Sequence, residues 1–369
     1  MAALTNTLVV SIEQAVAAPY CTRLLVEAGA RVIKVERPDG DFARHYDTIV
    51  NGESAYFVWL NNGKESLLLN AKDADDKQLL RSILEKADVF IQNLRPGAVN
   101  ALGFGYEQIV EFNPKIIMCS ISGYGSEGDY ANKKAYDFLV QGESGLCSIT
   151  GAPGEPARAG ISVCDISTGL TAYSEILRAL LQRNNSGVGE HLDISLFDVM
   201  AEWMSVPLVV YKYGNKLLSG TGLDHSQIAP YGVHQASDGP FIIAVQHQGE
   251  WQNLCELVLG KPELTNDPRF ANNVLRLENR EELTQAIESF TRLYPRDVIA
   301  QKMESGGIAY GNLNNCSDVL DHPALKTKQV VSDGKTAELV RRVCDDATEP
   351  REIPALGEHS EQIRREFLD

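Results

Sequence analysis

One carboxylate stands where it could act as a nucleophile. Asp165 ends the short apolar run 161–165, which predicts a strand, and a long helical pattern follows over 166–183. An aspartate carboxylate can attack an acyl carbon and hold the acyl group as an anhydride or thioester, and its small neighbours would leave room for that group. An aspartate directly before a helix also commonly caps the orphan amide donors. The residues alone leave both roles open for Asp165.

A second polar segment, Lys134–Asp137, precedes a predicted helix over 138–146 with Gln141 one turn inside it. Asp137 could simply stabilise the positive end of the helix dipole. Alternatively, Tyr136 and Asp137 could line a pocket.

Two loops could also contact a ligand. Arg37 follows a predicted strand at 31–35, and open α/β sheets bind ligands at the carboxyl ends of their strands. Its guanidinium could grip a phosphate or could lie solvated in a loop. The stretch Ser219–Asp224, with Gly220 and Gly222, is either a mobile cover loop or a linker.

Several common sites have no counterpart in the sequence. The first predicted strand-to-helix turn, 12–19, contains no glycine, so the G-x-G-x-x-G dinucleotide fingerprint and the G-x-x-x-x-G-K-[ST] phosphate loop are both missing. The seven cysteines form no C-x-x-C pair and the histidines no cluster. We therefore expect no metal, no permanently bound cofactor, and a reduced cytoplasmic setting.

The elements that must position these residues alternate between strand and helix. The apolar patterns predict strands at 8–12, 31–35, 66–69, 89–92, 116–122 and 189–194, and helices at 19–28, 77–86, 97–102, 166–183 and up to 203. This alternation predicts an open, Rossmann-like parallel sheet with helices on both faces. A strand at 241–245 and helices at 250–259 and 280–294 predict a second, smaller unit, and a charged helix at 360–367 ends the chain.

Length and composition set the outer limits. The chain has 369 residues, 44% of them hydrophobic and 23% charged, as in ordinary folded proteins of one or two domains. Fifty acidic against 34 basic side chains give a net charge of −16, which disfavours nucleic-acid binding. No apolar run is long enough to span a membrane, and the first residues do not resemble a signal peptide.

Taken together, the motifs resemble the class III CoA-transferases (the CaiB/BaiF group), which include formyl-CoA:oxalate and carnitine CoA-transferases and, by fold, α-methylacyl-CoA racemase. The resemblance runs through nearly the whole chain, at 18–19, 28–38, 61–69, 87–97, 122–125, 165–169 and 354–359. It implies an enzyme that moves CoA from an acyl-CoA donor to a small carboxylic acid, possibly a dicarboxylic one. It also implies an aspartyl-anhydride intermediate and then an aspartyl-CoA thioester.

The family's functional positions carry over residue by residue. The resemblance implies Asp165 as the nucleophile and Asp137, Gln141, Gly220 and Gly222 as residues around the substrate pocket. It implies that CoA contacts Val16, Ala17, Arg37, Leu69, Lys72, Asn93, Lys134 and Tyr136.

Three departures from relatives bear on the activity. The formyl-CoA enzyme has a glutamine where Val16 stands and an arginine where Ala101 stands, which weakens the expectation of oxalate-type chemistry. The four-glycine loop of the formyl-CoA enzyme corresponds here to residues 219–222, which contain fewer glycines. The racemase has a histidine base where Tyr136 stands, and a tyrosine is a poor base at neutral pH. An acyl-CoA racemase or isomerase is thus the first alternative, and a non-catalytic acyl-CoA-binding protein the second.

The resemblance also implies the organisation of the chain. We expect a large CoA-binding domain from residues 1–200 and 320–369, a small α+β domain from 225–315, and linkers at 201–224 and 316–319. We also expect two chains interlocked as a homodimer.

Overall fold

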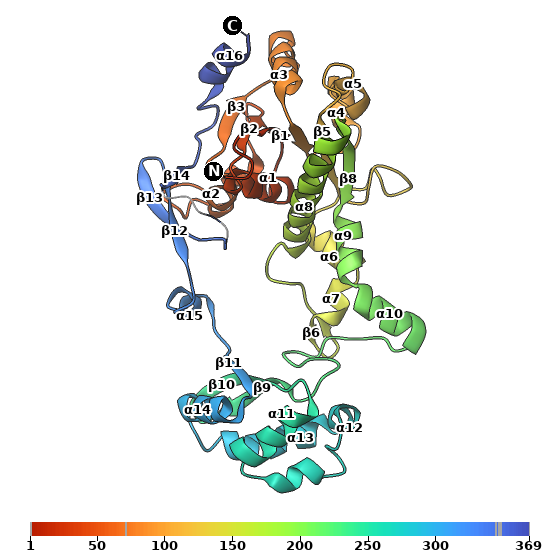
Figure 1. Cartoon of the computed structure of the whole chain (residues 1–369), viewed down its shortest axis with the longest axis vertical. Coiled ribbons are helices and arrows are strands. Elements are labelled where there is room, and N and C mark those ends of the chain that lie inside the picture. The colour runs from red at the N-terminus through yellow and green to blue at the C-terminus, as the bar shows by residue number, and fades with distance from the viewer. Residues whose placement is uncertain (1, 71, 344, 346–348, 369) are drawn as a thin grey trace. The chain divides into compact units, whose positions relative to one another are not determined.

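The computed structural model describes residues 2–70, 72–343, 345 and 349–368 (Figure 1). The chain divides into two compact units. The first consists of Met1–Leu146, Ala159–Val209 and Lys326–Asp369, and the second of Cys147–Arg158 and Val210–Leu325. Both ends of the chain therefore build the first unit.

A six-stranded parallel sheet forms the centre of the first unit, in the order β3-β2-β1-β4-β5-β8. Its strands are β1 (Leu8–Ile12), β2 (Arg31–Glu36), β3 (Glu65–Leu68), β4 (Val89–Gln92), β5 (Ile117–Ser122) and β8 (His191–Ser195). The expected open parallel α/β sheet is confirmed. The strand order reverses between β1 and β4, and ligands of such sheets bind beyond the carboxyl ends of the strands at that point.

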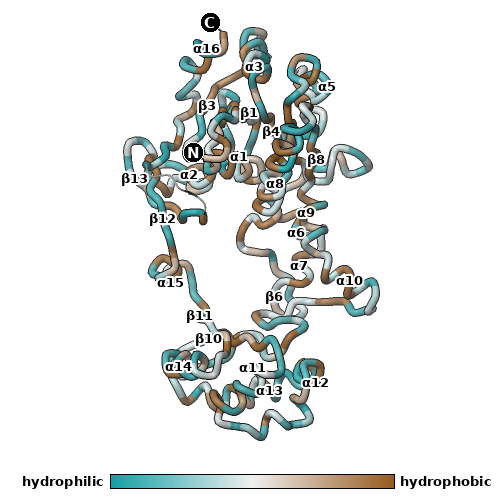
Figure 2. The backbone as a smooth tube through the Cα atoms, viewed as in Figure 1, coloured by the Kyte–Doolittle hydropathy of each residue, from teal (hydrophilic) through white to brown (hydrophobic). Residues whose placement is uncertain are grey.

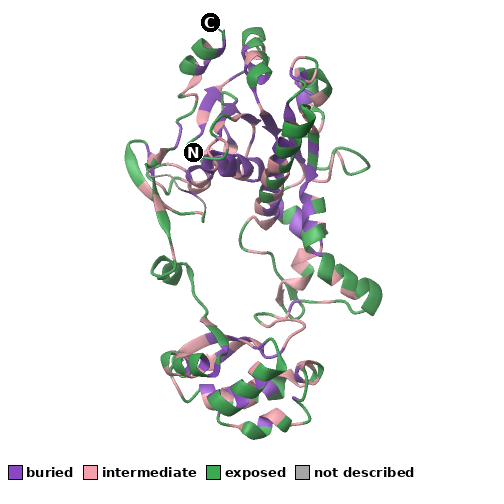
Figure 3. Ribbon diagram, viewed as in Figure 1, coloured by how far each residue is buried: buried purple, intermediate pink, exposed green. Residues whose placement is uncertain are grey.

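Helices cover both faces of this sheet. They are α1 (Ala17–Glu27), η1 (Phe42–His45), α2 (Ala55–Asn61), α3 (Ala74–Lys86), α4 (Ala98–Leu102), α5 (Tyr106–Ile109), α6 (Asp137–Glu143), α8 (Val163–Ser186), α9 (Leu196–Trp203) and α16 (Ser360–Leu368). One core packs α1, α6, α8 and α9 against the sheet, and a second core lies under α3, α4, α5 and α16. Figure 3 shows the strands and α1 as the buried centre of this unit.

The helices α1 and α8 lie on the same face of the parallel sheet, although the connections that contain them run across the sheet in opposite directions. α1 connects β1 to β2, and α8 lies on the connection from β5 to β8. Two such crossovers on one face must have opposite hands. The β3–β4 and β4–β5 connections advance in the same direction as β5–β8 but lie over the other face, so they share the hand of β1–β2, and the β5–β8 connection is the exception. On the other face of β5 and β8, the described residues place the short helices α4 and α5.

Gly169 lets α8 approach α1 closely. A Cβ at this position would lie 2.4 Å from the Ala17 carbonyl oxygen and 3.1 Å from Tyr20 Cβ. We expect Gly169→Ala to lower the free energy of unfolding by about 1–3 kcal/mol, because the backbones must move apart. Urea denaturation measures this.

Gly142→Ala is the matched control for that substitution. Gly142 is also helical, in α6, but a Cβ there would meet no atom within 4 Å. This variant should keep or slightly raise the stability. Equal effects of the two substitutions would contradict the close approach at Gly169.

The C-terminal segment closes the first unit against β3. The His359 amide donates to the Ser66 carbonyl, Ser66 donates its amide to His359 Nδ1, and the Leu68 amide donates to Ser360 Oγ. A small sheet, β13 (Lys335–Val340), β12 (Thr327–Ser332) and β14 (Arg351–Glu352), precedes this segment. Segments almost 300 residues apart are thus joined.

The second unit has its own core around Trp251 and Phe270. Its elements are β6 (Gly151–Ala152), β7 (Glu155–Pro156), β9 (Tyr231–Ala236), β10 (Gly239–Ala244), β11 (Ala309–Asn312), α11 (Gln248–Asn253), the π-helix η2 (Leu254–Val258), the 3₁₀-helix η3 (Pro262–Asn266), α12 (Asn273–Glu278), α13 (Arg280–Thr291), α14 (Arg296–Gly306) and α15 (Cys316–Leu320). The single helix expected at 250–259 is instead α11 continued by η2. The expected helix at 138–146 ends at Glu143, and α7 (Leu146–Ile149) follows.

α10 (Ser205–Gly214) combines apolar composition with exposure. Figure 2 shows hydrophobic stretches along it, and Figure 3 shows it as exposed. Its exposed large side chains are Val206, Leu208, Val209, Tyr211 and Tyr213. None of the helices in the described part of the chain is long and apolar enough to cross a membrane.

Candidate active site

Asp165 lies in the first turn of α8. The helix begins at Val163 after Ser162, so Asp165 is its third residue, and the described residues 161–165 form no strand. The predicted strand is therefore wrong, and so is the interpretation of Asp165 as the N-cap. Asp165 does not cap the helix because another residue, 28 positions earlier in the sequence, accepts the amides there.

Asp137 caps α8 from another element. Its Oδ1 accepts the amides of Cys164 at 2.8 Å and Asp165 at 3.3 Å. Gln141 fixes this carboxylate by donating Nε2 to Asp137 Oδ2 at 2.7 Å, while its own Oε1 accepts the Ala159 amide. Asp137 thus takes the orphan amides, and the Asp165 carboxylate is not used as a cap.

The Asp165 carboxyl has an unusual proton affinity. It is partly buried, and among the described residues it makes no ion pair and accepts no hydrogen bond through its side chain. Burial first, and then the negative charge of Asp137, raise its pKa from 3.8 to about 7. A carboxylate that binds protons this strongly is also a stronger nucleophile once ionised.

The raised pKa of Asp165 predicts a stability gain on its removal. The native carboxyl keeps its proton up to about pH 7, whereas the unfolded one loses it near pH 3.8. The stability from this group is therefore present below pH 3.8 and lost as the pH rises through 7. We expect Asp165→Asn to be more stable than the wild type at pH 8, by up to about 4 kcal/mol.

Urea denaturation at several pH values measures this effect. The gain should grow between about pH 4 and pH 7 and stay constant above. A stability difference between Asp165→Asn and the wild type that is the same at pH 4 and pH 8 would contradict the raised pKa.

A cavity of about 340 Å³ lies beyond the carboxyl ends of β1, β2 and β3. It brings together three of the predicted CoA contacts, Arg37, Leu69 and Lys72. The rest of the wall comes from the ends of β1 and β2, from the segments that follow β1, β2, β3 and β4, and from α3 and α4. Its other lining residues are Ile12, Glu13, Gln14, Val35, Glu36, Pro38, Gly40, Asp41, Asn70, Asp76, Lys77, Leu80, Leu94, Leu102 and Phe104. The place agrees with the switch point of the sheet.

The charges around this cavity leave it positive. Each of its acids has a basic partner in the protein: Glu13 with Lys64 and Lys34, Asp41 with Lys34, Glu36 with Arg44, and Asp76 with Arg364. In contrast, Arg37, Lys72 and Lys77 make no ion pair within the described residues. Three cations thus remain for an anionic ligand, and Lys77 joins the two that the sequence predicted.

Tyr46 is affected by the charges of two carboxyl groups, one of which lines this cavity. Burial first, and then the charges of Asp41 and Asp165, raise the pKa of Tyr46 to about 12. Both carboxyl groups are therefore within electrostatic range of its hydroxyl, and Asp41 also lines the cavity. Tyr46 stacks edge-on against Tyr56, with ring centroids 5.6 Å apart. Neither tyrosine stands in a motif that sequence analysis could have singled out.

The remaining predicted residues lie outside the cavity wall. Val16 and Ala17 begin α1, whose Ala17 carbonyl contacts Gly169, four residues after Asp165. Asn93 donates Nδ2 to the Gln14 carbonyl and accepts the Gln14 amide. Lys134 and Tyr136 are exposed before α6.

The loop with Gly220 and Gly222 belongs to the second unit. There the Gly222 amide donates to the Gly151 carbonyl at 2.7 Å. A Cβ at Gly220 would lie 2.4 Å from that same oxygen. Within its unit this loop is therefore packed tightly on β6.

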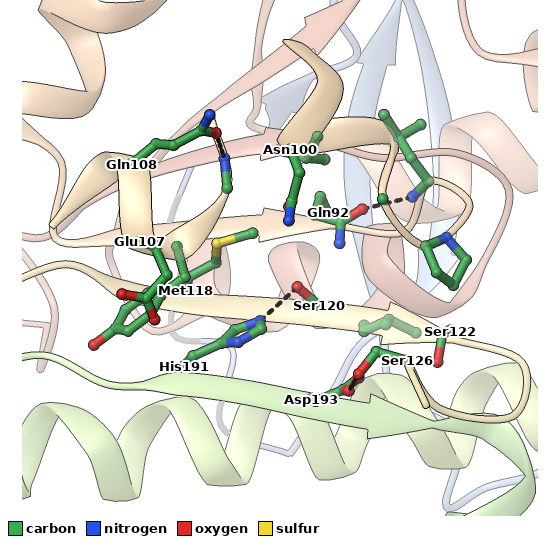
Figure 4. Close-up of a pocket in the computed structure, with 17 residues that line it drawn as sticks. Gln92, Asn100, Glu107, Gln108, Met118, Ser120, Ser122, Ser126, His191 and Asp193 are labelled. Carbon is green, nitrogen blue, oxygen red and sulfur yellow. Dashed lines mark hydrogen bonds between the residues drawn. The ribbon is translucent and has the colours of Figure 1, made fainter. Parts of the chain in front are cut away.

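A second cavity, of about 570 Å³, lies over the open face of β4, β5 and β8 (Figure 4). His191 Nε2 and Ser120 Oγ are 2.8 Å apart there, Tyr106 stacks on His191, and Ser126 donates to Asp193. None of the predicted site residues lines it, and its described wall holds no lysine or arginine. It therefore suits a polyanion far less than the first cavity. No group of three potential metal ligands occurs in the described parts of the chain.

The chain is similar to known proteins along nearly its whole length. The family model described as CoA-transferase family III matches residues 4–360. The chain is 34% identical to the acetyl-CoA:oxalate CoA-transferase of Acetobacter aceti, over 98% of this chain and 94% of that protein. It is 32% identical to the human succinyl-CoA:glutarate CoA-transferase, over 98% of this chain and 85% of that protein.

Solved structures give the same answer. A CAIB/BAIF family protein from Brucella suis superposes with a TM-score of 0.84 at 33% identity, covering 99% of each chain. The hypothetical protein Rv3272 from Mycobacterium tuberculosis has a TM-score of 0.86 at 26% identity, over 98% of this chain and 99% of that one. A six-stranded parallel sheet and a positive cavity at its switch point thus accompany a family match along nearly the whole sequence, and the chain belongs to CoA-transferase family III.

Proposed function

We propose that this protein transfers CoA from an acyl-CoA donor to a small dicarboxylic acid, with Asp165 as the nucleophile. One observation carries the proposal. Within the described residues the Asp165 carboxylate has no basic partner, its pKa is raised to about 7, and it stands one helical turn from the contact of α8 with α1. The turn before α1 lines the cavity, whose wall also includes three cations without an acidic partner among the described residues. The names of the relatives, which act on oxalate, glutarate or mesaconate, support a dicarboxylic acceptor.

The reaction needs four displacements and no redox partner. An Asp165 oxygen attacks the thioester carbon of the donor, the C–S bond breaks, and an aspartyl anhydride and the CoA thiolate form. The thiolate then attacks the Asp165 carbonyl carbon, which releases the donor acid and leaves an aspartyl-CoA thioester. The acceptor carboxylate attacks this thioester to give a second anhydride, and the thiolate takes the acceptor acyl group. Asp165 is regenerated as a carboxylate.

The first cavity supports CoA as the ligand. We assign the phosphates of CoA to Arg37, Lys72 and Lys77, whose charges no acid in the described residues neutralises. Leu69, Leu80 and Phe104 give the cavity an apolar wall on which a purine ring can pack. Lys134 and Tyr136, on the segment before α6, are proposed as further contacts.

We also propose a homodimer in the cytoplasm. The exposed apolar side chains of α10 form a surface of the kind that proteins usually bury against a partner. The buried cysteines Cys21 and Cys119, which form no disulfide, fit a reducing compartment. Light scattering of the purified protein checks the assembly, and a monomer would contradict it.

A substrate panel tests the proposed activity. Purified protein is incubated with acetyl-, succinyl- or formyl-CoA and with oxalate, succinate, glutarate or mesaconate, and new acyl-CoA species are measured by mass spectrometry. We expect at least one donor–acceptor pair to exchange CoA. Incorporation of deuterium from D₂O at the α-carbon without CoA exchange would instead indicate a racemase. The absence of both deuterium incorporation and CoA exchange would indicate a binding protein.

A further inference from the structure

The turn between β1 and α1 is strained. Ala15 has φ of +61°, a left-handed conformation that residues with a Cβ rarely adopt. Its neighbour Gln14 lines the CoA cavity, and Val16 starts α1. Such a conformation persists only where surrounding groups fix it.

Two side chains from neighbouring strands hold this turn. Asn93, just after β4, donates Nδ2 to the Gln14 carbonyl at 2.8 Å and accepts the Gln14 amide at 2.9 Å. Asp41, after β2, accepts the Ala15 amide with Oδ1 at 3.1 Å. The turn is therefore held by hydrogen bonds from residues that follow β4 and β2, the strands on either side of β1.

Asp41 is itself fixed by buried charges. Its Oδ2 lies 2.8 Å from Lys34 Nζ, and the Lys34 side chain is 0% exposed. Lys34 Nζ also lies 3.4 Å from Glu13, which pairs with Lys64 at 2.7 Å. Lys64 in turn donates to the Pro19 carbonyl at 3.1 Å, so the same cluster reaches the first turn of α1.

This cluster of two lysines (Lys34 and Lys64) and two carboxylates (Glu13 and Asp41) is expected to contribute little to the free energy of unfolding. Buried ion pairs commonly contribute no more than well-packed apolar side chains, because both partners lose their hydration. Their geometry, however, is rigid. The cluster fixes Asp41 Oδ1 opposite the Ala15 amide while Oδ2 is occupied by Lys34.

We propose that Asp41, held by Lys34, and Asn93 are positioning residues for CoA. They keep Ala15 left-handed, so that Gln14 forms the cavity wall and Ala17 faces α8 near Asp165. The proposal rests on the proposed function, since it assigns the cavity to CoA. Asn93 acts in it through the turn and not through a bond to the ligand.

Substitutions at Ala15 test the proposal without touching a buried charge. Glycine accepts positive φ, so Ala15→Gly should bind CoA within about twofold of the wild type. The β-branched Ala15→Val opposes this φ and should weaken CoA binding about tenfold or more. Isothermal titration with CoA itself gives the affinities, and a melting curve checks that each variant is folded.

Asp333→Val is the matched control, because Asp333 also has positive φ, +49°, in the β12–β13 turn away from the cavity. It should lose stability but not CoA affinity. Asp41→Ala should raise the KM for the acyl-CoA donor about tenfold or more, with a much smaller change in kcat and in the KM for the acceptor. Asp41→Asn, which keeps an oxygen for the Ala15 amide, should recover part of that loss.

The result that overturns the inference is a folded Ala15→Val protein with wild-type affinity for CoA. A change in kcat that equals the change in KM for Asp41→Ala would also overturn it. These outcomes differ from failure of the proposed function, in which the wild type itself binds no CoA.

Discussion

Asp165→Asn should reduce kcat for CoA exchange by about 10³-fold or more, because the amide cannot form the anhydride. The KM for the donor should change little, since CoA is held by the cavity and not by this carboxyl. Steady-state rates from the mass-spectrometric exchange assay give both constants. The same variant is expected to be more stable than the wild type, so its loss of activity cannot come from unfolding.

Asp193→Asn is the control for this substitution. Asp193 is an exposed carboxylate that lines the second cavity, and its removal should leave the exchange rate unchanged. Exchange at the wild-type rate in Asp165→Asn would end the assignment of the nucleophile.

Reversing two charges of the first cavity should have the second largest effect. In Arg37→Glu combined with Lys72→Glu, one cation remains against two new anions, and the KM for acyl-CoA should rise about 10²-fold. The kcat at saturating donor should stay within a few-fold. Added salt should reduce the difference in KM between the double variant and the wild type, because Arg37 and Lys72 are exposed and salt screens their charges.

Lys115→Glu provides a control for charge reversal outside the cavity, to be compared with Arg37→Glu or Lys72→Glu alone. Lys115 is exposed just before β5, at the opposite edge of the sheet, so its reversal changes the net charge without changing the cavity. An equal rise in KM for this control would mean that total charge, and not Arg37 and Lys72, governs CoA binding.

The sequence predicted the central sheet because its elements carry strong local signals. Strands such as β1 and β4 are continuous apolar runs, and α8 has helical spacing over its whole length. These signals placed Arg37 at the carboxyl end of β2, where the structure has it, whereas the strand predicted before Asp165 is absent. In the second unit, β9 and β11 carry no such runs and were not predicted, whereas the apolar β10 was.

The site depends more on contacts between distant residues. The cap of α8 comes from Asp137, 28 residues before Asp165, and no local pattern distinguishes this from a cap by Asp165 itself. The left-handed Ala15 is equally hidden, since alanine has no preference for positive φ and Asp41 holds it from another strand.

The overall charge was also a poor guide to the ligand. A net charge of −16 would repel the phosphates of CoA. The cavity differs from the rest of the surface because its acids are paired within the protein, while Arg37, Lys72 and Lys77 have no acidic partner in the part of the chain that the structure describes. Such pairing is a property of the fold and cannot be counted from the sequence.

Chemical trapping tests the central claim most directly. The wild type is incubated with an active acyl-CoA donor, treated with hydroxylamine and digested, and its peptides are searched by mass spectrometry for aspartyl and glutamyl hydroxamates. We predict a hydroxamate on the side chain of Asp165, formed only when donor is present. An active enzyme in which Asp165 stays unmodified, or in which another carboxylate is labelled instead, would contradict Asp165 as the nucleophile.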